Sequence, residues 1–169
     1  YIALGSNIGD REVNLNSAIE KFGDQAQVIK RSSIYQTEPW GFHDQAPFLN
    51  MVIQVQSNLT PRSLLTFLKN LEVEIGRTPT FRNGPRVIDL DILFYDDLVL
   101  AEEGLEIPHP RLKDRVFVLV PLCEIAPDLI HPVTKTPLDK YLAKLEIVGI
   151  LMYKKKKRMS LIGEMMTPE

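Results

Sequence analysis

Four stretches of the chain carry apolar residues at the close spacing of β-strands: residues 1–4, 27–35, 48–56 and 86–95. The third stretch alternates between two faces, as the side chains of a strand must. One of its faces carries Leu49, Met51, Ile53 and Val55, and the other carries Phe48 and Val52. The fourth stretch is rich in branched apolar residues and therefore predicts a buried strand.

Apolar residues at helical spacing predict two helices between these strands. Asp10 is a suitable N-cap for a helix from Arg11 to about Phe22. Thr60 followed by Pro61 predicts a second helix start, because a capping hydroxyl precedes proline at the first helical position. The buried faces of the two helices are formed by Leu15, Ile19 and Phe22, and by Leu64, Leu65, Leu68, Leu71 and Ile75, with Gly76 as a natural end.

The remaining elements are short. Residues 96–100 predict a hairpin-like piece, and further helices are expected at about 114–123 and 138–145. The order strand, helix, strand, strand, helix, strand is the ferredoxin-like, split β-α-β pattern. We therefore expect an α+β fold, in which helices pack on one face of a single antiparallel sheet and extra helices follow at the C-terminal end.

Two acidic residues interrupt the fourth strand. Asp89 and Asp91 lie on the same side, about 6.6 Å apart along the strand. Asp is mostly exposed, so a solvated face is the ordinary interpretation of such a pair. Apolar residues on both faces favour a central strand instead, where two carboxylates need a cation. One or two magnesium ions fit this oxygen ligand set, and Arg86 on the same strand suggests a polyphosphate ligand.

Composition adds limits rather than a function. The 169 residues are 44% hydrophobic and 25% charged, which suits one globular domain. A net charge of −2 gives no drive toward nucleic acid or membrane, and no apolar run is long enough for a bilayer. Cys123 is the only cysteine, so a reducing, cytoplasmic location is expected. Because the chain starts at Tyr1 without methionine, we expect trimming or a fragment of a longer polypeptide.

The last part of the chain differs in character. We expect a domain over residues 1–146 and a tail over residues 147–169, disordered or packed locally. The tail contains the basic run Lys154 to Arg158 and a Met-rich end. Such a run is usually solvated, and the alternative is a role in localisation or in binding an acidic partner.

Several motifs occur in order along residues 1–145. They are Gly5-Ser6-Asn7 with Asn14-Leu15, Ser33-x-Tyr35-x-Thr37-x-Pro39, Phe48-Leu49-Asn50, Gly84-Pro85-Arg86-x-x-Asp89-Leu90-Asp91-Ile92, Pro108-His109-Pro110 and Arg115-x-Phe117-x-Leu119-x-Pro121-Leu122. With these motifs the chain resembles the 6-hydroxymethyl-7,8-dihydropterin pyrophosphokinase family of folate biosynthesis. The resemblance implies transfer of pyrophosphate from ATP to the pterin hydroxymethyl group, leaving AMP. It also allows fusion or adjacency to other folate-pathway enzymes.

The resemblance implies a nucleotide site that has no P-loop, and the sequence of this chain contains no P-loop motif. Asp89 and Asp91 would bind two magnesium ions, and together with Arg77 and Arg86 they form the implied catalytic set. The implied ATP-binding residues are Glu72, Arg77, Arg82, Arg86, Ile92, His109 and Arg115. For each arginine a surface ion pair is the alternative, and for Glu72 a solvated helix face. Arg82 matches less well because its loop is one residue shorter than the best-known pattern of the family. Pro110 stands where some members of the family have an aromatic residue.

The implied pterin site is aromatic and polar. Its residues are Thr37, Pro39, Trp40, Phe48, Asn50 and Phe117. Phe48 and Phe117 would stack on the flat ring, and Asn50 would bind its edge. Core packing is the alternative for the two phenylalanines, a turn or edge-strand position for Asn50, and a hydrophobic lid for Trp40.

Two competing functions are weighed against this one. A magnesium-dependent phosphohydrolase would use the same carboxylates but release ADP or phosphate. A non-catalytic ferredoxin-like binding module would have lost the acidic pair or the arginines, and both are intact.

Overall fold

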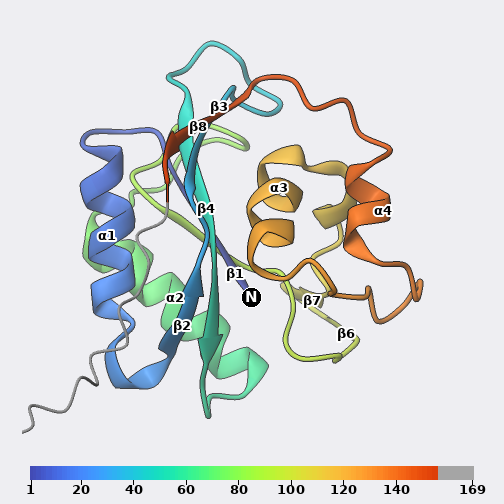
Figure 1. Cartoon of the computed structure of the whole chain (residues 1–169). Helices are drawn as coiled ribbons and strands as arrows, with labels where there is room; N and C mark the ends of the chain where they lie inside the picture. The colour runs from blue at the N-terminus through green and yellow to red at the C-terminus, as the bar shows by residue number, and fades with distance from the viewer. Residues whose placement is uncertain (156–169) are drawn as a thin grey trace, which may run out of the picture.

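The computed structural model describes residues 1–155 as three layers, with helices on both faces of a central sheet (Figure 1). The strands are β1 (Ile2–Ser6), β2 (Gln27–Arg31), β3 (Ile34–Thr37), β4 (Phe48–Gln56), β5 (Asp89–Ile92), β6 (Leu100–Glu102), β7 (Leu105–Ile107) and β8 (Ile150–Lys154). The α-helices are α1 (Arg11–Lys21), α2 (Pro61–Ile75), α3 (Val116–Ile125) and α4 (Leu138–Leu142), with 3-10 turns at Gly23–Gln25 and Leu112–Asp114.

The sheet confirms the ferredoxin-like expectation. Its strand order is β5-β1-β4-β3-β8, with β2 also paired to β4, and every pairing is antiparallel. The single strand expected over residues 27–35 is wrong, because the chain forms β2 and β3 with a break between them. At this break the Ser32 hydroxyl accepts the Val52 N–H at 2.9 Å, so a side chain replaces part of the backbone ladder.

Two further expectations about strands need correction. The strand expected over residues 86–95 is regular only over β5. The backbone of Arg86 instead bonds to Asn7, whose Oδ1 accepts the Arg86 N–H at 2.8 Å and whose N–H donates to the Arg86 carbonyl at 3.1 Å. The hairpin expected at residues 96–100 lies later, where β6 pairs with β7.

The helix boundaries follow the capping signals in the sequence. The Asp10 carboxylate accepts the Val13 N–H at 3.0 Å, and the Thr60 hydroxyl accepts the Ser63 N–H at 3.2 Å. Gly76 ends α2 in the left-handed region, with φ of 110°, where a side chain would be strained. Both predicted starts and the predicted end of α2 are therefore confirmed.

Helices cover both faces of the sheet, whereas the sequence predicted one covered face followed by extra helices. The core between the sheet and α1 and α2 contains Ile2, Leu4, Leu15, Leu49, Met51, Ile53, Leu68, Leu90 and Ile92. The second core, against α3 and α4, contains Val52, Leu93, Phe94, Leu119, Leu122 and Leu138. Figure 1 shows α3 and α4 on the side opposite α1 and α2. The second core covers only part of its face, and the rest remains open to a cavity.

Part of the expected tail extends the sheet. Residues 150–154 form β8, which pairs with β3, and Lys154 forms an ion pair with Glu12. Leu151, Met152 and Tyr153 on this edge strand are exposed. The basic run after Lys155 and the Met-rich end lie outside the described residues.

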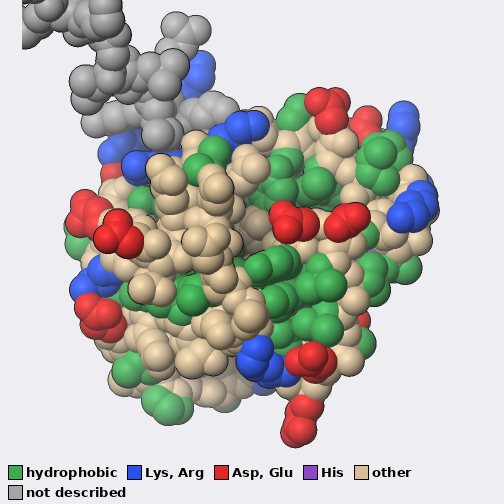
Figure 2. Space-filling view, turned by 90° about the horizontal axis from the view of Figure 1, so that it is seen from below, with side chains coloured by type: hydrophobic (Ala, Val, Ile, Leu, Met, Phe, Trp, Pro, Cys, Tyr) green, Lys and Arg blue, Asp and Glu red, His purple; other side chains and the backbone are tan. Residues whose placement is uncertain are grey.

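The surface combines apolar and charged side chains. The view in Figure 2 shows a broad patch of hydrophobic side chains with Lys, Arg, Asp and Glu around it. No helix within residues 1–155 combines the length and apolar character needed to cross a bilayer.

Candidate active site

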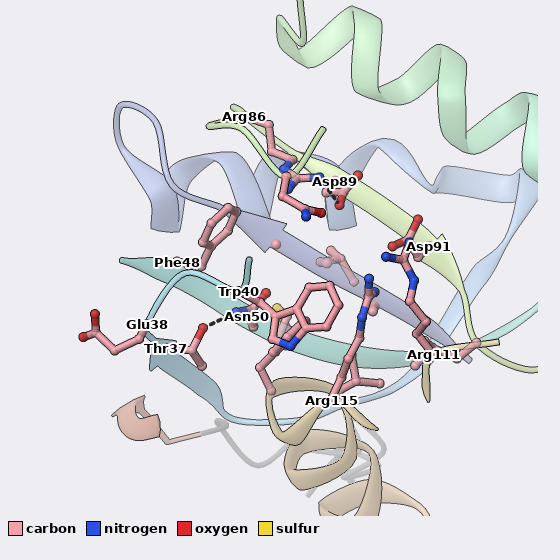
Figure 3. A pocket seen from close by; sticks show the side chains of 18 of the residues that line it. Thr37, Glu38, Trp40, Phe48, Asn50, Arg86, Asp89, Asp91, Arg111 and Arg115 are labelled. Atoms are coloured by element: carbon pink, nitrogen blue, oxygen red, sulfur yellow. Dashed lines mark hydrogen bonds and ion pairs between the residues drawn. The ribbon is translucent and has the colours of Figure 1, made fainter. Parts of the chain in front are cut away.

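A cavity of about 250 Å³ opens on the α3 side of the sheet, between β1, β4, β5 and the loops before β4 and β5 (Figure 3). Its charged lining residues are Lys69, Arg77, Arg86, Arg111 and Arg115, and Glu38, Asp89 and Asp91. The excess of cations over carboxylates favours an anionic ligand with several charges.

The strand register explains why part of the cavity floor carries no large side chain. Asp89 pairs with Gly5, and Asp91 pairs with Ala3, so a very small residue lies beside each carboxylate. Gly5 also pairs with Asn50 on the next strand. Asp89 and Asn50 are therefore separated by two strand spacings, roughly 10 Å, with no side chain between them.

The two carboxylates have different partners. Asp89 accepts hydrogen bonds from Arg77 at 2.7 Å and from Arg86 at 3.0 Å. Asp91 lies 3.9 Å from the Lys69 ammonium, and a third of its side chain is exposed. Burial raises the pKa of Asp91 to about 6, repulsion from Asp89 adds to the rise, and Lys69 and Arg115 oppose it. A further cation beside Asp91 would favour its charged form.

The donor set fits magnesium once a ligand contributes oxygens. No group of three or more His, Cys, Asp or Glu side chains within residues 1–155 could hold a metal by itself. Two carboxylates fit an ion that also binds phosphate oxygens. The Nε–H groups of Arg86 and Arg115 are buried without an acceptor within the same residues. Two unsatisfied guanidinium donors beside the carboxylates are a fit for an oxyanion.

Glu72 lies behind the acidic strand rather than in the cavity lining. Its buried carboxylate accepts from Lys69 at 2.7 Å, from Arg77 at 2.5 Å and from the Leu90 N–H at 2.7 Å. Lys69 also donates to the Leu90 carbonyl at 3.1 Å. Because β5 is an edge strand, Lys69 and Glu72 satisfy backbone groups that would otherwise have no neighbouring strand. Glu72 thus positions Arg77 and Lys69, and its direct contact with ATP stays a prediction.

Aromatic rings and guanidinium groups alternate around the cavity. Arg86 lies 5.5 Å from the centre of the Phe48 ring, and Arg115 lies 5.5 Å from that of Phe117. The Trp40 ring lies 5.2 Å from Arg115 and 5.7 Å from Arg111. Such cation–π contacts hold flat surfaces and positive charge side by side. The lining therefore suits a molecule with a flat ring next to an anionic group.

Asn50 is oriented by its neighbours. Its Nδ2 donates to the Thr37 hydroxyl at 2.6 Å, a bond drawn in Figure 3. A Cβ atom on Gly5 would lie 2.7 Å from the Asn50 Oδ1. Gly5 is thus required by the close approach of Asn50 and not by a turn.

Two loops at the rim of the cavity contact each other. Asn7 is buried and donates to the Gln45 Oε1 at 2.9 Å and to the Ala46 carbonyl at 3.0 Å, while it also holds the backbone of Arg86. Gln45 donates to the Asn83 carbonyl at 2.8 Å. The Phe42 and Phe81 rings pack edge to face with centres 5.1 Å apart. The loop before β4 is therefore coupled to the loop that carries the arginines.

A second hollow of about 300 Å³ lies on the other side of Asp91. Asp91, Leu65, Ile92, His109 and Pro110 are among its lining residues, so Asp91 borders both spaces. Burial lowers the pKa of His109 to about 4, and Arg115 and Arg111 lower it further. Its Nδ1 accepts the Arg111 N–H at 3.2 Å, so the neutral ring carries its proton on Nε2.

The structure brings most of the predicted residues together. The cavity is lined by Thr37, Trp40, Phe48, Asn50, Arg77, Arg86, Asp89, Asp91, Arg115 and Phe117, and the second hollow by Asp91, Ile92 and His109. Pro39 is buried and Arg82 is exposed, and neither lines these spaces. Sequence reasoning missed Lys69 and Arg111. The i,i+3 spacing of Lys69 and Glu72 was a weak signal, and Arg111 directly follows the Pro108-His109-Pro110 motif.

The chain is similar to known proteins over most of its length. The model of the 7,8-dihydro-6-hydroxymethylpterin-pyrophosphokinase family matches residues 1–127. The 2-amino-4-hydroxy-6-hydroxymethyldihydropteridine pyrophosphokinase of Aquifex aeolicus is 43% identical over 141 residues, covering 83% of this chain and 88% of that protein. The Bacillus subtilis protein of the same name is 46% identical over 142 residues, covering 83% and 85%.

Longer proteins also match. A folic acid synthesis protein of Pneumocystis carinii is 45% identical over 146 residues, which are 86% of this chain but 20% of that protein. A solved HPPK-DHPS structure in complex with substrates has a TM-score of 0.70 at 14% identity, covering 84% of this chain and 42% of that one. At this identity the solved structure supports the fold alone. The chain thus spans most of the two bacterial relatives and a fraction of the longer ones.

Proposed function

The chain belongs to the 7,8-dihydro-6-hydroxymethylpterin-pyrophosphokinase family, and we propose that it transfers pyrophosphate from ATP to the hydroxymethyl group of 6-hydroxymethyl-7,8-dihydropterin. The observation that carries this proposal is the position of Asp91 between an aromatic cavity and a second hollow. One space suits the acceptor and the other the nucleotide, with the acidic pair where the two substrates meet. Fusion or adjacency to other folate enzymes stays a prediction for this chain.

The acceptor pterin would lie in the first cavity. Its ring would occupy the free floor above Gly5, between the Phe48 and Phe117 rings, with its edge at Asn50. The roughly 10 Å between Asn50 and Asp89 spans a two-ring heterocycle with a short substituent. The hydroxymethyl group would therefore point toward the carboxylates, where the phosphates arrive.

The nucleotide would lie across the second hollow, beside Ile92 and His109. Its phosphates would extend past Asp91 into the first cavity, which Arg77, Arg86 and Arg115 line. Their forked guanidinium groups match phosphate oxygens. Arg86 and Arg115 have buried Nε–H groups with no acceptor among residues 1–155. Without a P-loop, these side chains would take the place of a backbone cradle.

Asp89 and Asp91 would hold magnesium. When bound, magnesium would supply positive charge that offsets the negative charge developing during the transfer of pyrophosphate. The pterin hydroxyl oxygen would attack the β-phosphorus, the bond from that phosphorus to the bridging oxygen of AMP would break, and the hydroxyl proton would leave to solvent. No side chain of the cavity stands out as a general base, so positioning and electrostatic stabilisation would supply the rate enhancement.

The test is a direct assay with purified protein, MgATP and 6-hydroxymethyl-7,8-dihydropterin, in which nucleotide products are separated by chromatography. Pterin-dependent AMP that disappears with EDTA supports the proposal. ADP or free phosphate would support a phosphohydrolase instead. ATP binding without any AMP would indicate a non-catalytic domain.

A further inference from the structure

Lys69 lies beside the acidic strand but has no role in the proposed reaction. It projects from α2 past the edge of β5, and its ammonium lies 2.7 Å from Glu72, 3.1 Å from the Leu90 carbonyl and 3.9 Å from Asp91. It lines the first cavity and retains 44% of its side-chain exposure. It is thus fixed by two hydrogen bonds and presents its charge to Asp91.

Both carboxylates of the pair already have cationic neighbours within the protein. Asp89 is held by Arg77 and Arg86, and Asp91 faces Lys69. The lining has more cations than carboxylates, so a free divalent ion approaching the cavity meets net positive charge. A lone ion would have to displace these partners and bring no replacement for them.

We propose that Lys69 is a resident counter-ion that prevents Asp91 from binding a free divalent cation, so that the metal enters together with the phosphates of the nucleotide. A polyphosphate changes the balance because its oxygens give the lysine and the arginines new partners. The carboxylates are then released to the metal. This inference rests on the proposed function only for the identity of the anionic ligand.

The test measures binding of Mn²⁺ alone, without nucleotide or pterin, by the loss of the electron paramagnetic resonance signal of free Mn²⁺. Lys69→Met keeps the side-chain volume and removes the charge. We expect this variant to bind Mn²⁺ about tenfold more tightly than the unmodified protein, which corresponds to about 1.4 kcal/mol. Lys69→Arg, which keeps the charge, should bind like the unmodified protein.

Two controls separate this effect from general ones. Lys140→Met removes an equal charge from the exposed face of α4 and should leave Mn²⁺ binding unchanged. The double variant Lys69→Met/Glu72→Gln removes the carboxylate that Lys69 also neutralises, and it should keep the gain. Loss of the gain in the double variant would assign it to Glu72 and overturn the proposal.

A purely structural role for Lys69 predicts a different pattern. Losing the bond to the Leu90 carbonyl would lower the melting temperature but leave Mn²⁺ affinity as it was. Equal Mn²⁺ binding by Lys69→Met and the unmodified protein would therefore overturn the inference. Because the measurement uses no substrate, it can succeed or fail independently of the AMP assay.

Discussion

The same strands of the sheet carry two very different faces. Toward α1 and α2, residues such as Leu4, Met51 and Leu90 pack into a continuous apolar core. Toward α3, the neighbouring positions Gly5, Asn50 and Asp89 line a charged cavity. Strand alternation alone separates the two sets, since neighbouring residues point to opposite faces. The apolar face keeps the strands rigid, and the polar face can therefore hold charges at defined distances.

The largest expected effect comes from the carboxylates of the polar face. Asp89→Ala and Asp91→Ala should each reduce turnover by about 10²–10³, because an electrostatic group acting on the transferred phosphate is lost. The folded state should lose less stability than after truncation of a core residue, since these side chains are not part of either apolar core. Pterin-dependent AMP formation measures the effect, with the exposed Asp97→Ala as a control that should retain activity. Near-normal turnover of either variant would remove that residue from the site.

Leu90, between the two aspartates on the same strand, should affect stability rather than turnover. Leu90 is fully buried against α1 and α2, so Leu90→Ala should lower the free energy of unfolding by about 3 kcal/mol through lost burial and a cavity. Urea denaturation measures this change. Turnover per folded molecule should change much less than in the aspartate variants. A turnover loss of the aspartate size, at a temperature where Leu90→Ala is folded, would show that the two faces are not separable.

A smaller effect should come from the space above Gly5. An added Cβ in Gly5→Ala would displace the Asn50 amide from its bond to Thr37. We expect KM for the pterin to rise about tenfold, or about 1.4 kcal/mol, while KM for ATP is retained. Steady-state kinetics with each substrate varied in turn measures the difference.

The double variant Gly5→Ala/Asn50→Ala sharpens this test. If Gly5 acts only through Asn50, the double variant should be no worse than Asn50→Ala alone, because the two changes share one interaction. Additive losses would instead indicate that the ring itself needs the space above Gly5.

The smallest effect concerns pH and His109. Its pKa in the folded protein is about 4, below the ordinary 6.5, so between these values the unfolded chain takes up a proton that the folded protein does not. Stability should therefore decrease as pH falls from about 6.5 to about 4. Allowing for solvent screening of a partly exposed ring, we expect the free energy of unfolding to fall by about 1 kcal/mol. His109→Gln should remove this part of the pH dependence. Urea denaturation of both proteins at pH 4, 5, 6 and 7 measures it. If the two free energies of unfolding differ by the same amount at every pH, the prediction is contradicted.

Signals between residues a few positions apart predicted the acidic pair of the site and the ends of the two helices. Asp89 and Asp91 share a face because a strand has a period of two, and Asp10, Thr60 and Gly76 mark helix ends through their own chemistry. The second predicted strand failed for a long-range reason. The Ser32 side chain binds the backbone of β4, twenty residues away, and breaks the strand there.

Lys69 and Arg111 show the same limit within the site. Neither belongs to a motif with the carboxylates. Lys69 reaches the cavity from α2, which packs beside β5, and Arg111 lies just before the 3-10 turn that contacts α3. Whether these long side chains reach the cavity depends on how the segments that carry them pack in the folded protein. Sequence spacing does not encode that choice.

The sequence by itself determined the two capped helices α1 and α2, the ferredoxin-like fold class, the acidic strand and the resemblance to the family to which the chain belongs. The tertiary structure decided that α3 covers the second face, that β8 joins the sheet, and that Asp91 faces Lys69 and borders two spaces. The reason is physical. Hydrophobic period and capping act between residues a few positions apart, whereas a cavity between layers exists only after distant segments have packed.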